Sequence, residues 1–287
     1  MNNYAVIDIG SNSVRLMFVA DGTVLYKAVE TTRLGEGLAH ATTLLPQAIE
    51  RSAKAVADFY FRAKNEGAEN VYAFATAAVR TAENGAEFVH AVEKLCGLQV
   101  EVVSGETEAE IGILGALGFA DGSVIDIGGA STEIVVQLAQ KMLYKKSVNI
   151  GVVRLRDACG LDKTKLEQTA LHAAQTFGEV PKAKTYAIGG TATALAAWHL
   201  GLKTYDGNKV TGTEITIKDM QTMADKLLAM SPQEIYHSSC MPKGRADVIA
   251  GGAVLLCTLM RALGIDSVIV SDKDNLEGYA TKKGLKI

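Results

Sequence analysis

Paired cysteines and histidines are missing from this 287-residue chain. The four cysteines show no CxxC or other paired spacing, which argues against a zinc ribbon or a redox motif. The five histidines form no HxxxH or HExxH pair, so a histidine metal site is not expected. Unpaired thiols in a chain whose first residues lack a signal-peptide pattern are typical of a reducing compartment, and we predict a cytoplasmic protein.

Long apolar runs and a large net charge are also missing. The uncharged stretch 248–260 is too short to cross a bilayer, so no membrane span is expected. The formal charge is −3, whereas DNA-binding proteins are usually basic, so no DNA partner is expected. Hydrophobic residues make up 48% of the chain, which is ample for a buried core. At roughly 150 residues per domain, the length predicts about two domains, and a homodimer is compatible with this composition.

Charge is divided unevenly along the chain. Residues 1–118 carry a net charge of −6 and residues 119–287 a net charge of +3. Two interpretations follow: chance, or a second half that meets a polyanion.

Glycine is abundant, with 28 glycines against 4 prolines, which favours tight turns near ligands over proline-rich linkers. One glycine-containing motif occurs twice, beginning at Asp8 and again at Asp126, 118 positions further on. Each copy follows a strand-like segment and precedes a second one. The repetition indicates a duplicated domain.

The surrounding pattern supports that duplication. The first half predicts strands at 4–9, 14–20, 23–30, 71–75 and 99–103, and helices at 46–65, 84–96 and 105–118. The second half predicts strands at 123–127, 132–138, 141–148, 184–188 and 267–270, and helices at 163–178, 190–200, 218–229, 243–263 and from 274. We therefore predict an α/β fold with two duplicated domains, 1–118 and 119–287, each in the order βββαβαβα and separated by an interdomain cleft.

The two hairpin tips are candidates for phosphate binding, because ligands of such sheets bind beyond strand ends and between domains. The first tip offers Ser11, Asn12 and Ser13 as donors, with Arg15 following on the strand. The alternative interpretation is an ordinary polar turn.

The second tip is richer in chemistry. Its Gly128, Gly129, Ser131 and Thr132 are bracketed by two acids, Asp126 and Glu133. Carboxylates of this kind suit Mg²⁺ or another divalent cation held together with substrate phosphates. A turn of this composition without a ligand is the alternative.

Three other positions follow strand ends or open helices. Gly189 and Gly190 form a strand–turn–helix junction that favours an anion, or else a plain helix start. Arg80 and Arg245 are phosphate ligands or ordinary surface arginines. The segment 104–110 opens a helix at the domain boundary, where a carboxylate can deprotonate a water or merely complement the helix dipole.

The motifs DIGSNSVRL (8–16) and DIGGASTEIVV (126–136) resemble the phosphate motifs of the actin and sugar-kinase superfamily, which has ribonuclease H-like, actin-like ATPase domains. More narrowly, the chain resembles the exopolyphosphatase / guanosine pentaphosphate phosphohydrolase (Ppx/GppA) family in its short two-domain form. The segments VVSGETEAEIGILGAL (102–117), ATAAVRTAENGAEF (75–88), YAIGGTATALAA (186–197) and VSDKDNLEGYA (270–280) carry this resemblance.

The resemblance implies a role for each candidate. Glu108 matches the carboxylate that positions the attacking water, although Thr107 stands where the family commonly has an acid. Asp126 and Glu133 match acidic positions around the metal and phosphates, and Arg15 and Arg245 match positions used for a guanosine polyphosphate. The implied phosphate-cradling positions are Ser11, Asn12, Ser13, Arg80, Gly128, Gly129, Ser131 and Thr132.

We therefore predict hydrolysis of the terminal phosphoanhydride of polyphosphate. The alternatives are hydrolysis of guanosine pentaphosphate and a guanosine polyphosphate-binding regulator with little turnover. Phosphoryl transfer to an acceptor such as a sugar is disfavoured by Glu108 and by the missing sugar-pocket signature.

Overall fold

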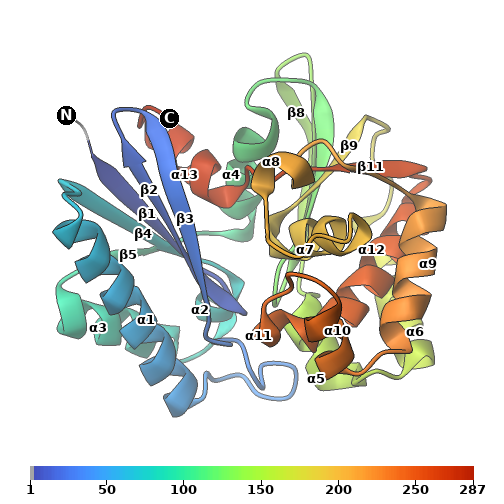
Figure 1. The fold of residues 1–287 in the computed structure, drawn as a ribbon, viewed down its shortest axis with the longest axis horizontal. Helices are drawn as coiled ribbons and strands as arrows, with labels where there is room; N and C mark the ends of the chain where they lie inside the picture. The colour runs from blue at the N-terminus through green and yellow to red at the C-terminus, as the bar shows by residue number, and fades with distance from the viewer. Residues whose placement is uncertain (1–2) are drawn as a thin grey trace.

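The computed structural model describes residues 3–287, and it contains two sheets with helices around and between them (Figure 1). The first lobe is built around the sheet β3-β2-β1-β4-β5, in which β1 is antiparallel to β2 and parallel to β4. Its elements are β1 (Tyr4–Ile9), β2 (Ser13–Ala20), β3 (Thr23–Thr31), α1 (Pro46–Asn65), β4 (Asn70–Ala75), α2 (Ala77–Thr81), α3 (Gly85–Cys96), β5 (Val100–Val102) and α4 (Gly105–Leu117).

The second lobe repeats this plan around the sheet β10-β11-β9-β6-β7-β8. Its β6 is antiparallel to β7 and parallel to β9, as β1 is to β2 and β4. The elements are β6 (Gly122–Ile127), β7 (Thr132–Leu138), β8 (Lys141–Val148), α5 (Val152–Cys159), α6 (Lys163–Phe177), β9 (Thr185–Ile188), α7 (Gly189–His199), α8 (Gly207–Val210), β10 (Glu214–Thr216), α9 (Ile217–Leu228), α10 (Pro232–Ser238), α11 (Lys243–Ala246), α12 (Ile249–Leu263), β11 (Ser267–Val270) and α13 (Asn275–Lys282).

The helices α4 and α13 lie between the two sheets (Figure 1). On α4, Ala109 and Ile113 pack into a buried cluster with residues of β6 and β7. Leu276 and Tyr279 of α13 pack instead with residues of β1 and β2. The last helix of the chain therefore covers the first sheet, and the domain division at residue 118 stays a prediction.

Glycines let these two helices approach closely. A Cβ atom on Gly115 would lie 1.8 Å from the carbonyl oxygen of Asp274, and one on Gly278 would lie 1.7 Å from that of Ile111. Both positions therefore require glycine. Glu108 lies on α4, and the first residue of α13, Asn275, donates a hydrogen bond to Asp126 of the second sheet, so this contact fixes groups of both lobes relative to each other.

The second lobe contains elements that the sequence pattern does not predict. Residues 152–159 form α5, residues 214–216 form the edge strand β10, and residues 232–238 form α10. The single helix predicted over 243–263 is wrong, since the chain forms α11 and α12 with a break at Asp247 and Val248. None of the helices within residues 3–287 combines the length and the apolar character that crossing a bilayer requires.

Candidate functional site

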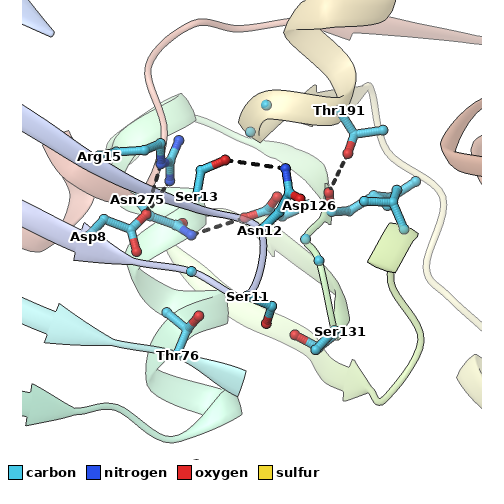
Figure 2. A pocket seen from close by; sticks show the side chains of 18 of the residues that line it. Asp8, Ser11, Asn12, Ser13, Arg15, Thr76, Asp126, Ser131, Thr191 and Asn275 are labelled. Carbon is cyan, nitrogen blue, oxygen red and sulfur yellow. Dashed lines mark hydrogen bonds and ion pairs between the residues drawn. The ribbon is translucent and has the colours of Figure 1, made fainter. Parts of the chain in front are cut away.

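The tips of the two repeated hairpins meet in the cleft between the lobes. Each tip has the same hydrogen bond, from Gly10 N to Ser13 O at 3.0 Å and from Gly128 N to Ser131 O at 2.9 Å. A Cβ atom on Gly129 would lie 2.7 Å from the Cβ atom of Ser11, so the tips are in contact and glycine is required there. The side chains of Ser11 and Ser131 face each other from the two lobes (Figure 2).

A cavity of about 70 Å³ lies at this contact. A water molecule occupies about 30 Å³ of liquid, so the cavity has room for a phosphoryl group or a few waters. Most of the candidates predicted from the sequence line it: Ser11, Asn12, Ser13, Arg15, Glu108, Asp126, Gly128, Gly129, Ser131, Gly189, Gly190 and Arg245. The sequence motifs therefore converge on one small space, although they come from five separate segments.

Backbone N–H groups without acceptors point to an anion in this cavity. Within residues 3–287, no backbone or side-chain acceptor serves the N–H groups of Ser11 and Asn12 on one tip or of Gly129 and Ala130 on the other. The helix α7 also begins at Gly189 without a side-chain cap. Buried backbone donors nearly always have a partner in folded proteins, so these groups are suited to ligand oxygens.

Three of the candidates, Thr132, Glu133 and Arg80, lie outside the cavity lining and make internal contacts instead. The Thr132 hydroxyl donates to the Ile150 carbonyl at 2.6 Å. The Ser147 hydroxyl donates to Oε1 of Glu133 at 2.5 Å. The contacts of Arg80 are described below with Glu108.

The duplication places different charges at equivalent positions of the two lobes. Asp8 is the register partner of Arg15 on β1 and β2, and Asp126 is the register partner of Glu133 on β6 and β7. In the first lobe the pair is neutral, because Arg15 forms an ion pair with Asp8. In the second lobe two acids stand side by side. The hairpin of the second lobe therefore has no basic residue at the position that Arg15 occupies in the first lobe.

The electrostatics of the acidic groups fit a bound cation. Burial raises the pKa of Asp126 to about 8, and repulsion from Asp274, Glu108 and Asp8 adds to the effect of burial. Burial also raises the pKa of Glu133 well above its usual value, with repulsion from Glu108 and Asp126. The Oε2 atom of Glu133 is buried and has no hydrogen-bond partner. A cation would restore the ionised forms of these groups.

The oxygen donors of the cavity fit a metal ion that is held jointly by the protein and by the substrate. Across the described part of the chain, no three His, Cys, Asp or Glu side chains are placed to hold a metal ion together. Asp126, with Glu133 behind it, supplies carboxylate oxygens next to the anion-binding tips. Mg²⁺ is commonly held in this way, by one or two carboxylates plus phosphate oxygens.

Glu108 faces the cavity from the first turn of α4. The Ser104 side chain caps this helix by accepting a hydrogen bond from Thr107 N at 3.1 Å, which fixes where the turn begins. Burial raises the pKa of Glu108 to about 7, against the opposing effect of Arg80, whose Nη1 lies 2.8 Å from Oε2 of Glu108. The pKa of this carboxyl is therefore close to neutral pH.

The two arginines of the cavity differ in their partners. Arg15 forms ion pairs with Asp8 and Asp274, so its charge is neutralised within the protein. No acidic residue among those described lies within ion-pair distance of Arg245, and burial lowers its pKa to about 10. A Cβ atom on Gly190 would lie 1.9 Å from Nη1 of Arg245, so glycine makes room for this guanidinium. Arg245 is available to an anion.

Sequence motifs alone do not reveal several residues of the cavity. Asn275, the first residue of α13, donates from Nδ2 to Oδ2 of Asp126 at 3.0 Å (Figure 2). Thr191 donates to the Ile127 carbonyl at 2.8 Å, and Thr76 lines the cavity from the end of β4. The acidic capping box that opens α13 was the available signal for Asn275, but its partner is 149 positions away.

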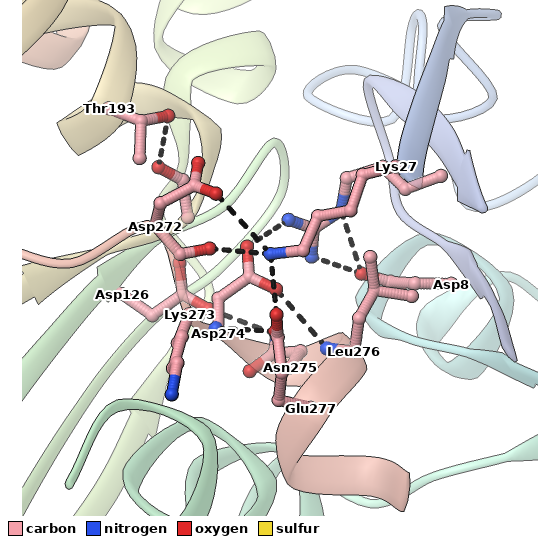
Figure 3. Close-up of polar contacts among 12 residues, drawn as sticks. Asp8, Lys27, Asp126, Thr193, Asp272, Lys273, Asp274, Asn275, Leu276 and Glu277 are labelled. Atoms are coloured by element: carbon pink, nitrogen blue, oxygen red, sulfur yellow. Dashed lines mark hydrogen bonds and ion pairs between the residues drawn. The ribbon is translucent and has the colours of Figure 1, made fainter. Parts of the chain in front are cut away.

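A second cavity, of about 270 Å³, adjoins the first and shares Arg15, Gly190 and Arg245 with it. Its apolar lining comes mainly from β3, α7 and the segment 240–242, and the remaining lining residues are Tyr205, Asp272, Asp274 and Leu276. At its polar side Lys27 forms ion pairs with Asp272 and Glu277 (Figure 3). A phosphorylated organic molecule could place its phosphate in the first cavity and its organic part in the second.

Comparison with known proteins agrees with this geometry. Exopolyphosphatase 2 of Mycobacterium tuberculosis is 30% identical, and the alignment covers 98% of each chain. Guanosine-5′-triphosphate,3′-diphosphate pyrophosphatase of Pseudoalteromonas translucida is 31% identical, over 99% of this chain and 58% of that protein. The crystal structure of the Aquifex aeolicus member of the Ppx/GppA family superposes with a TM-score of 0.78 and 27% identity, covering 98% of this chain and 97% of the other.

These similarities confirm the predicted two-lobed, actin-like fold. The profile of the Ppx/GppA phosphatase family matches residues 5–285, which is nearly the whole chain. This chain belongs to the Ppx/GppA phosphatase family.

Proposed function

We propose that this protein is an exopolyphosphatase, which hydrolyses the terminal phosphoanhydride of inorganic polyphosphate and releases orthophosphate. The observation that carries the proposal is Glu108, a buried carboxyl with a pKa of about 7 beside a cavity lined by unpaired N–H groups. A general base works best when its pKa is near the working pH. The similarity to an exopolyphosphatase over the full chain supports the same activity.

The terminal phosphate binds between the two tips. The backbone N–H groups of Ser11, Asn12, Gly129 and Ala130 donate to its oxygens, and Arg245 contributes a positive charge. These donors are fixed by the hairpins before substrate arrives, so they need little reorganisation in the transition state. The small volume of the cavity, about 70 Å³, favours binding of the end of a chain over binding of its internal phosphates.

Asp126 and Glu133 would hold Mg²⁺ at the phosphate. When bound, the ion neutralises charge that develops on the transferred group. The amide of Asn275 keeps Asp126 oriented, since it donates to Oδ2 at 3.0 Å. The Asp8–Arg15 pair of the first lobe remains neutral and contributes positioning only.

Glu108 orients the attacking water and takes its proton. The water oxygen forms a bond to the terminal phosphorus while the bond from that phosphorus to the bridging oxygen breaks. Orthophosphate and a polyphosphate one unit shorter are released, and the proton held by Glu108 then passes to solvent. General base catalysis of this kind typically contributes about 10²–10⁴-fold to the rate.

The test is orthophosphate release from long-chain polyphosphate by the wild-type protein and by Glu108→Gln. We expect the variant to lose turnover by about 10²-fold or more while it keeps its fold. The matched control is Glu106→Gln, a change on the same helical turn of a side chain that is 79% exposed. Wild-type turnover in Glu108→Gln would remove the proposed base.

Guanosine pentaphosphate is the second candidate substrate, and the larger cavity favours it. That cavity shares Arg15 and Arg245 with the phosphate site, and its apolar lining suits an organic group. Comparing kcat/KM for guanosine pentaphosphate and for polyphosphate decides between the two. Tight nucleotide binding with negligible phosphate release would instead indicate a regulator, for which Thr107 in place of an acid would be the sequence basis.

The proposed setting is the cytoplasm. All four cysteines are free thiols. Free thiols persist in reducing compartments, which supports that location.

A further inference from the structure

Arg80 is held beside Glu108 by a short helix. The helix α2 follows β4 at Thr76 and ends at Thr81, so Arg80 lies in its last turn. Its Nη1 donates to the Val103 carbonyl at 3.0 Å and to Oε2 of Glu108 at 2.8 Å. Side-chain exposure is 20% for Arg80 and 7% for Glu108, so the pair is largely removed from water.

Both anchors of Arg80 belong to the framework of the first lobe. Val103 follows β5 and its N–H donates to the Ala75 carbonyl at 3.0 Å, which ties it to the end of β4. The next residue, Ser104, caps the helix that carries Glu108. A single guanidinium nitrogen therefore joins the end of the sheet to the carboxylate, and it fixes the direction of Glu108.

The other charged groups that act on Glu108 are acidic. Asp8 faces it from β1, and Asp126 and Glu133 act on it from β6 and β7. Burial and this repulsion favour the protonated carboxyl, whereas Arg80 and the Thr76 hydroxyl favour the ionised form. A base must be ionised to take a proton from water, so Glu108 depends on Arg80.

We infer that Arg80 is a positioning residue, which aims Glu108 at the water and favours its ionised form, and that it is not a ligand of the substrate phosphate. Arg80 lies outside the cavity lining, and both partners of its Nη1 are protein atoms. The inference rests on the proposed function only in treating Glu108 as the base.

The first test is the pH profile of kcat/KM for polyphosphate in Arg80→Met and Arg80→Lys. In Arg80→Met we expect the acidic limb to move to higher pH by about 1–3 units, because the opposing charge is gone. Activity should partly recover at alkaline pH, and KM should change little. Arg80→Lys, which keeps the charge, should keep the limb near the wild-type position. An unmoved limb with KM raised about tenfold or more would make Arg80 a phosphate ligand.

The second test needs no activity, so it separates this inference from the proposed function. Thermal unfolding is measured for Arg80→Met, Glu108→Gln and the double variant. We expect Arg80→Met to lower the melting temperature much less in the Glu108→Gln background than in the wild type, because no buried carboxylate is then left unpaired. The same coupling would be shown if Arg80→Met folded only in the Glu108→Gln background. Losses of melting temperature that simply add in the double variant would overturn the inference.

The matched control is Arg62→Met, which breaks the exposed Arg62–Glu66 pair on α1. We expect it to leave the pH profile and the melting temperature nearly unchanged. Should the wild-type protein release no phosphate from polyphosphate, the proposed function fails, and the unfolding experiment still reports on the pairing of Arg80 with Glu108.

Discussion

Replacing Glu108 by glutamine changes how stability depends on pH. In the unfolded chain this carboxyl ionises near its ordinary pKa of 4.5, whereas burial keeps it protonated in the folded protein up to about pH 7. The folded state therefore binds more protons than the unfolded state between these two values. The contribution of Glu108 to stability is present below the lower value and is lost as pH rises through this window. Glutamine has no such proton to lose.

The size of the effect follows from the shift. One pKa unit corresponds to about 1.4 kcal/mol, so a rise from 4.5 to about 7 amounts to about 3 kcal/mol. At roughly 2 °C or more per kcal/mol, the melting temperature of the wild type should fall by about 6 °C relative to Glu108→Gln between about pH 5 and pH 8.

The assay is thermal unfolding of both proteins in buffers with a chelator, so that no divalent cation masks the repulsion. Each pH gives one difference between the two melting temperatures, and any constant effect of the substitution cancels. A difference that stays the same within about 1 °C across this range would refute a raised pKa for Glu108. Glu108 would then also lack the pKa that suits a general base near neutral pH.

Three further predictions concern the metal, the free arginine and the helix contact. Asp126→Asn should raise the Mg²⁺ concentration for half-maximal turnover by about tenfold or more, as measured by titration of activity; an unchanged value would exclude Asp126 as a ligand. Arg245→Met removes a buried charge without an acidic partner, so it should raise the melting temperature of the ligand-free protein. The variant should also gain less stability than the wild type from added inorganic phosphate. An undiminished gain would contradict a role for Arg245 in binding an anion. Gly115→Ala should lower the free energy of unfolding, measured with a denaturant, by about 3 kcal/mol or more, because its Cβ atom would lie 1.8 Å from the Asp274 carbonyl oxygen. In the control Gly251→Ala the nearest atom to the new Cβ atom is 3.5 Å away, so the free energy of unfolding should hardly change.

The sequence predicts those elements of the fold whose local residue pattern alone favours the structure that they adopt. The two strands of the hairpin at 132–138 and 141–148 have the predicted bounds, because β-branched and apolar residues suit a sheet and the turn between them sets the register. The helix α5 escaped prediction because Val152 and Val153 disfavour a helix start by their own propensity. Their N–H groups donate to the Gly128 and Gly129 carbonyls at 3.0 and 2.8 Å, so the phosphate tip itself nucleates the helix.

The motifs of the site could be predicted from the sequence, but the pairing of its charged side chains could not. Glycines and hydroxyls beside a strand end mark the two tips, since few other residues fit there. Which charges neutralise each other depends on contacts across the chain. Arg15 is paired with Asp274, which is 259 positions away, and Arg80 turns toward Glu108 and not into the cavity. No local pattern contains that information.

We propose that the small cavity between the two tips admits only the end of a polyphosphate chain for hydrolysis beside Glu108. The most direct measurement is orthophosphate release in the presence of Mg²⁺ from two preparations of the same polyphosphate, one with free ends and one with both ends blocked by an organic ester. We expect release from the free-ended chain, loss of that release in Glu108→Gln, and resistance of the blocked chain. Equal release from both preparations would contradict it, because the chain would then be cut at internal bonds.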